Sequence, residues 1–121
     1  MPVYNERSTI EAAIADALGA DLPVDERQLV IVDDGSTDGT RDLLNGREWP
    51  ENVELVLHDR NRGKGAAVRT ALEHATGEYA AILDADLEYE AAGIGDLLHP
   101  LLDGRARVVF GTRAFASHSA Y

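Results

Sequence analysis

Short apolar runs that alternate with segments of helical spacing are the feature that most constrains this fold. The apolar runs, each short enough for a buried strand, are residues 28–32, 53–57, 79–83 and 107–110. The stretches with helical patterns are residues 6–18, 39–44, 66–75 and 94–102. Alternation of this kind predicts an α/β fold, in which one parallel sheet is covered by helices on both faces.

Length and composition predict a single domain over residues 1–121, because a chain of this size supports one hydrophobic core. No apolar run is long enough to cross a membrane, no secretory signal pattern is present, and cysteine is absent. We therefore expect a cytoplasmic protein. The net charge of −11 argues against a nucleic-acid partner, because phosphate binding needs a basic face.

Both ends of the sequence suggest a piece of a larger domain. Residues 2–5 resemble the tail of a strand, and the chain closes on residues 116–121, shortly after the fourth apolar run. We expect a truncated sheet, in which most of the first strand and a later half of the domain are missing.

Three acidic residues follow the third apolar run. Asp84, Asp86 and Glu88 alternate with Ala85 and Leu87, so an extended backbone would point all three carboxylates to one side. Such carboxylates repel one another unless a cation lies between them, and oxygen ligands suit Mg²⁺ or Mn²⁺. The alternative is a solvated acidic turn.

The loops after the first two apolar runs are also polar. Asp33 and Asp34 suit hydrogen-bond donors such as a ribose hydroxyl or a ring N–H of uracil or guanine, although either residue could instead close a turn. Residues 61–65 (NRGKG) place two cations and two glycines before a helix, where anions bind, or form a solvated turn. Because loops after parallel strands meet at one sheet edge, we expect these segments to converge.

The remaining candidates carry weaker signals. Arg113 follows the fourth apolar run, where its guanidinium could hold a diphosphate or lie at the surface. The histidines lack metal-ligand spacing, and we expect them on the surface or on helix flanks; they are His58, His74, His99 and His118.

Taken together, the motifs resemble those of family 2 glycosyltransferases, in particular the polyprenyl-phosphate branch of the dolichol-phosphate mannose synthase type. The segments that carry the resemblance are residues 2–6 (PVYNE), 32–40 (VDDGSTDGT), 61–65 (NRGKG), 84–89 (DADLEY) and 110–113 (FGTR). The resemblance covers the donor-binding half of such enzymes and implies a Rossmann-like sheet of the GT-A nucleotide-sugar transferase type.

The resemblance also implies roles for individual residues. Residues implied in nucleotide-sugar binding are Pro2, Tyr4, Glu6, Val32, Asp34, Lys64, Asp84, Ala85, Asp86 and Arg113. Asp86 and Glu88 would hold the divalent metal, Mg²⁺ or Mn²⁺, and Asp86 would be the catalytic carboxylate. Glu88 stands where the branch often has Gln, and Glu90-Ala91-Ala92 replaces a proline that usually follows the tyrosine.

The implied activity is metal-dependent transfer of a hexose from GDP-mannose or UDP-glucose to a polyprenyl phosphate, either in the cytoplasm or at the cytoplasmic face of the membrane. One alternative is a non-catalytic nucleotide-sugar-binding fragment that associates with another copy through an exposed sheet edge. A metal-dependent phosphatase shares the strand-Asp-x-Asp pattern, but it needs a downstream lysine, and the only lysine, Lys64, lies upstream.

Overall fold

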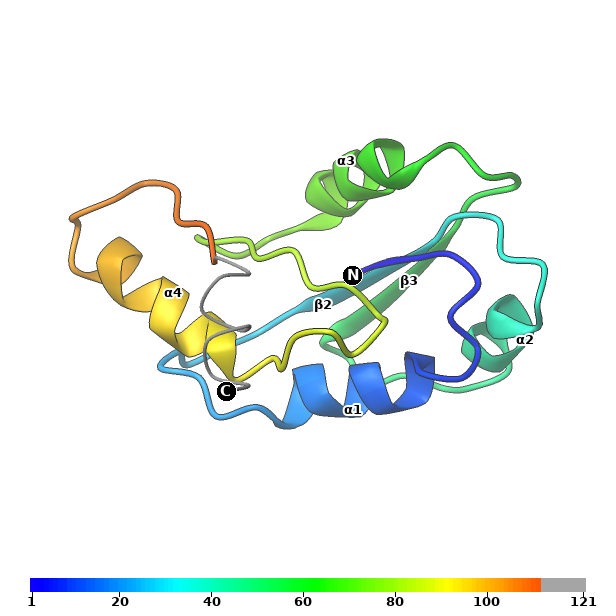
Figure 1. The fold of residues 1–121 in the computed structure, drawn as a ribbon, viewed down its shortest axis with the longest axis horizontal. Coiled ribbons are helices and arrows are strands. Elements are labelled where there is room, and N and C mark those ends of the chain that lie inside the picture. The colour runs from blue at the N-terminus through cyan, green and yellow to red at the C-terminus, as the bar shows by residue number, and fades with distance from the viewer. Residues whose placement is uncertain (112–121) are drawn as a thin grey trace.

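The structure of the protein, a computed structural model, describes residues 1–111. Its elements, shown in Figure 1, are β1 (Pro2–Val3), α1 (Ile10–Gly19), β2 (Leu29–Asp33), α2 (Thr40–Asn45), β3 (Val53–Leu57), α3 (Lys64–His74) and α4 (Gly93–Leu102). The strands form one parallel sheet in the order β1-β2-β3, with β2 at its centre. This arrangement confirms the predicted α/β class.

Helices cover the sheet on both faces, as the continuous apolar runs predict. Figure 1 shows α3 on one side of the strands and α1 and α2 on the other. Alternate residues of β2 serve the two faces: Ile31 packs in the cluster that includes Ile10 of α1, while Val30 and Val32 pack with Ala67 of α3. The central strand therefore holds both layers of the core in place.

Two predicted strands are wrong, because residues 79–83 and 107–110 form no sheet pairing. A strand needs a neighbouring edge, and β1, which comprises only Pro2 and Val3, already uses its register to pair with Val32 and Asp33 of β2. Its other edge can therefore offer at most two residues to a further strand. Ile82 is consequently 62% exposed, and Phe110 is 84% exposed.

The predicted helix from residue 6 begins later, at Ile10, because the backbone turns at Asn5, whose φ is 53°. Asn5 does not cap this helix. Its backbone N–H donates to Ser36 Oγ, and its side-chain oxygen accepts the N–H of Thr37. The segment after β1 is thereby tied to the loop after β2. Within residues 1–111, no helix is long and apolar enough to cross a membrane.

Candidate functional site

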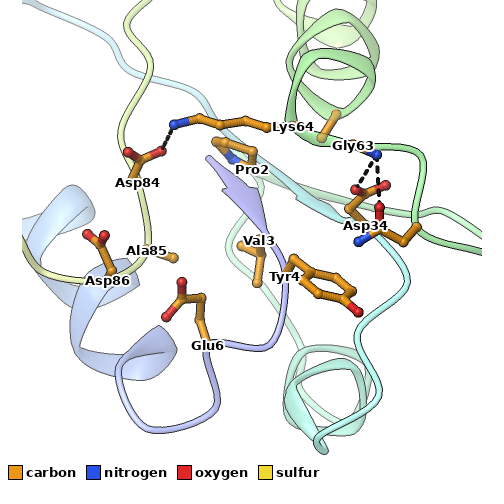
Figure 2. A pocket seen from close by; sticks show the side chains of 12 residues that line it. Pro2, Val3, Tyr4, Glu6, Asp34, Gly63, Lys64, Asp84, Ala85 and Asp86 are labelled. Carbon is orange, nitrogen blue, oxygen red and sulfur yellow. Dashed lines mark hydrogen bonds and ion pairs between the residues drawn. The ribbon is translucent and has the colours of Figure 1, made fainter.

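A cavity of about 310 Å³ lies where the carboxyl ends of the strands meet the start of α3. This edge is where open parallel sheets bind their ligands. The lining residues are Pro2, Val3, Tyr4, Glu6, Asp34, Asn61, Gly63, Lys64, Ala67, Asp84, Ala85 and Asp86. Figure 2 shows that these side chains come from the segment after β1, the loop after β2, the start of α3 and the segment at residues 84–86. Segments far apart in the sequence thus converge, as predicted.

Most of the residues singled out from the sequence lie around this cavity. They are Pro2, Tyr4, Glu6, Asp34, Lys64, Asp84, Ala85 and Asp86. Val32 does not line it, because its side chain is fully buried beneath α3. Glu88 is not among the lining residues either, and Arg113 lies outside the described residues.

The acidic segment does not stay extended, so the expectation that three carboxylates share one side is wrong. The backbone turns at Leu87, whose φ is 60°, and the N–H of Glu88 donates to Oδ1 of Asp86 at 3.0 Å. This turn leaves Asp84 and Asp86 at the cavity. Ala85 between them is buried, and its carbonyl accepts a hydrogen bond of 2.6 Å from the Thr9 hydroxyl.

Lys64 is the basic side chain of the cavity lining. It is the first residue of α3, directly after Gly63, whose φ of 96° favours glycine. Its Nζ lies 2.7 Å from Oδ1 of Asp84, and Figure 2 shows this ion pair joining the two segments. Both side chains are partly exposed, so the pair can exchange partners with a ligand.

The two aspartates after β2 differ in their surroundings. Asp33 is fully buried, and its Oδ2 accepts the N–H of Ser36, so it closes a turn and does not line the cavity. Asp34 lines the cavity while it accepts the backbone N–H groups of Arg62 and Gly63, each at 2.9 Å. The next paragraph concerns a further partner of Asp34.

His58 is the functional residue that the sequence reasoning missed. It is 5% exposed, so its expected surface position is wrong. Its Nδ1 lies 2.8 Å from Oδ1 of Asp34. Burial alone would raise the pKa of Asp34, but the hydrogen bonds from His58 and from the N–H groups of Arg62 and Gly63 outweigh it and lower that pKa. The available signal was the position of His58 directly after an apolar strand.

The charges of the cavity decide what it can bind. Among the residues described, the lining carries four carboxylates, from Glu6, Asp34, Asp84 and Asp86, and one ammonium, from Lys64. A diphosphate would be repelled by this excess of negative charge unless a cation accompanied it. Within residues 1–111, no group of three acidic or histidine side chains could hold an ion alone. One or two carboxylates suffice for Mg²⁺ that also binds substrate phosphates, so the donor set fits a shared ion.

The fold and the cavity together define an α/β domain with a ligand site at the carboxyl edge of its sheet. The sequence profile described as "Glycosyl transferase family 2" matches residues 1–120, and the chain belongs to this family. The crystal structure of S. aureus TarS is similar, with a TM-score of 0.56 and 30% identity over 70% of this chain and 15% of that one. The predicted GT-A type of α/β fold is thus confirmed.

Curated relatives carry names of the same kind. TuaG of Bacillus subtilis (strain 168), named for teichuronic acid biosynthesis, is 42% identical over 86 residues, which are 70% of this chain and 33% of that protein. The undecaprenyl-phosphate 4-deoxy-4-formamido-L-arabinose transferase of Aeromonas hydrophila is 33% identical over 107 residues, which are 86% of this chain and 33% of that protein. The chain spans about a third of the length of these relatives.

Proposed function

We propose that this chain binds the nucleotide-sugar donor of a metal-dependent hexosyltransferase, with GDP-mannose or UDP-glucose as donor. The observation that carries the proposal is the cavity at the carboxyl edge of a family 2 sheet, in which Lys64 faces a cluster of carboxylates. Lys64 can contact a phosphate, and the acidic side chains can share a divalent cation with the diphosphate. The volume of about 310 Å³ suits a small ligand.

The proposal assigns roles by position in the cavity. Pro2, Tyr4 and Glu6 line the nucleotide pocket, and Asp34 accepts a donor group of the base. Asp84 and Ala85 lie beside the ribose and the sugar phosphate. Asp86 is the carboxylate that meets the metal in the cavity, Glu88 on the same turn is its second ligand, and Arg113 lies near the sugar-phosphate end. When bound, Mg²⁺ or Mn²⁺ offsets the negative charge of the leaving nucleoside diphosphate.

We further propose that the acceptor is a polyprenyl phosphate, as in enzymes of the dolichol-phosphate mannose synthase type. The likeness to a protein named as an undecaprenyl-phosphate sugar transferase supports this choice. A phosphate acceptor is already anionic, so a strong general base is unnecessary.

Isothermal titration of the 121-residue chain with UDP, GDP and their sugars, with and without Mn²⁺, tests the proposal. We expect binding that Mn²⁺ strengthens. An absence of binding under all these conditions would refute it. Transfer of the sugar to a polyprenyl phosphate separates an active transferase from a fragment that only binds the donor.

A further inference from the structure

His58 connects three parts of the site although it does not line the cavity. It directly follows β3, and its Nδ1 lies 2.8 Å from Oδ1 of Asp34, which directly follows β2. Its Nε2 lies 2.8 Å from the hydroxyl of Thr70 on α3. With 5% of its surface exposed, the imidazole has both ring nitrogens bonded to the protein.

These contacts fix the tautomer of His58. An ionised carboxylate only accepts hydrogen bonds, and the lowered pKa of Asp34 keeps its carboxylate ionised at neutral pH. Nδ1 therefore carries the proton and donates to Asp34. In a neutral imidazole, Nε2 is then the acceptor, and the Thr70 hydroxyl donates to it.

The donors around Asp34 also limit what a ligand can offer it. Oδ1 accepts from His58 Nδ1 and from the N–H of Arg62, while Oδ2 accepts from the N–H of Gly63. A carboxylate has about four acceptor positions, so protein donors fill all but one. The remaining position is on Oδ2, and Asp34 is a lining residue of the cavity.

We propose that His58 is a positioning residue that selects the nucleobase, because it holds Asp34 with a single acceptor position left for the ligand. This inference rests on the proposed function and makes it more specific. Uracil presents one ring N–H between two carbonyl groups. Guanine presents its N1–H and its exocyclic amine side by side, and the pair needs two acceptors. Asp34 held in this way favours a uridine nucleotide over a guanosine nucleotide.

Nitrogen NMR of the ligand-free chain, labelled with ¹⁵N-histidine, tests the contact independently of any nucleotide. We expect the His58 signals at neutral pH to show a protonated Nδ1 and an unprotonated Nε2. In Thr70→Val, where the hydroxyl is lost, the preference for this tautomer should weaken. A wild-type His58 protonated only at Nε2 would overturn the inference.

Calorimetric titration with UDP and GDP in the presence of Mn²⁺ tests the selection. The wild type should bind UDP at least about tenfold more tightly than GDP, as one unmatched hydrogen bond to a charged group predicts. His58→Phe removes the donor to Asp34, so UDP affinity and the UDP-to-GDP ratio should both fall. His58→Asn, whose amide N–H can take the place of Nδ1–H, should restore the ratio.

An equal ratio in the wild type, His58→Phe and His58→Asn would overturn the role of His58, even if their melting temperatures differ. If His58→Phe does not fold, the comparison of His58→Asn with Thr70→Val decides, since only the former keeps the amide donor without the imidazole. Failure of the wild type to bind either nucleotide would refute the proposed function, whereas the NMR measurement would still judge the contact between His58 and Asp34.

Discussion

The Nζ of Lys64 lies 2.7 Å from Oδ1 of Asp84, and this ion pair joins the first residue of α3 to the acidic segment of the cavity. The side chains are 61% and 38% exposed, so the pair contributes little to stability. Its position matters more, because a diphosphate in the cavity would compete with Asp84 for the lysine.

Lys64→Met should therefore weaken nucleotide-diphosphate binding while leaving the melting temperature nearly unchanged. We expect a loss of about tenfold in affinity, the size of one charged hydrogen bond. Arg69→Met is the matched control, because Arg69 is an exposed basic residue on the same helix and does not line the cavity. Titration calorimetry with UDP and GDP measures both variants. Equal losses in the two would indicate a general effect of charge and contradict the role of Lys64.

Gly35→Ala should strongly destabilise the fold. A Cβ on Gly35 would lie 2.5 Å from the backbone of Arg60 and of Asn61, and the φ of 78° is unfavourable for alanine. The loops after β2 and β3 would have to separate, at a cost of about 2 kcal/mol or more. Urea denaturation measures the change in the free energy of unfolding.

Gly93→Ala is the control for this substitution. No heavy atom lies within 4 Å of the added Cβ, and Gly93 begins α4. Its replacement should be neutral or stabilising by up to about 1 kcal/mol, because alanine favours a helix. If Gly35→Ala were tolerated as well as Gly93→Ala, the close approach of the two loops would be wrong.

The sequence predicts well those parts of the fold that depend on local pattern and on burial. The runs that became β2 and β3 are apolar throughout and have a partner on at least one side. Residues 79–83 have the same apolar character, but pairing is a property of the neighbouring edge, and β1 is two residues long. No local pattern reports the length of an edge formed elsewhere in the chain.

The candidate site shows the same division. Convergence of the loops follows from the parallel sheet, so the sequence could predict that Asp34, Lys64 and Asp84 meet. The turn at Leu87, with a φ of 60°, could not be predicted, because leucine seldom adopts this conformation. The burial of His58 depends on α3 and Asp34, and composition alone does not distinguish a buried histidine from an exposed one.

Asp34 predicts an acid-dependent loss of stability. Because its pKa is lowered in the folded protein, its contribution is fully present above the unfolded value of about 4 and is lost as the pH falls below it. The wild type should therefore exceed Asp34→Asn in free energy of unfolding at pH 6, and this difference should shrink as the pH falls below about 4.

Urea denaturation of both proteins across this pH range measures the difference. Asp38 also has a lowered pKa, which hydrogen bonds from the Thr40 hydroxyl and backbone outweigh burial to produce. Since both proteins keep Asp38, its titration cancels in the comparison. A difference that stays constant down to pH values well below 4 would contradict the ionised, hydrogen-bonded Asp34.

The proposed metal ligands predict a loss of the metal-dependent part of donor binding. The double substitution Asp86→Asn and Glu88→Gln should remove most of the gain in UDP affinity that Mn²⁺ provides, as should EDTA in the wild type. Glu90→Gln is the charge-matched control, since Glu90 follows the same turn but does not line the cavity. A gain from Mn²⁺ that survives the double substitution would refute these two residues as ligands.

Asn5 predicts a separable pair of effects at the entrance to the cavity. Its φ of 53° costs most non-glycine residues energy, and its side-chain oxygen accepts the N–H of Thr37 at 2.8 Å. Asn5→Gly relieves the backbone but loses the side-chain bond, whereas Asn5→Ala loses the bond and keeps the strain. We expect Asn5→Ala to be less stable than Asn5→Gly by about 1 kcal/mol. Because Asn5 lies between the lining residues Tyr4 and Glu6, both variants should also bind UDP more weakly than the wild type. Equal stability of the two variants, measured by urea denaturation, would show that the backbone at Asn5 is not in the left-handed conformation.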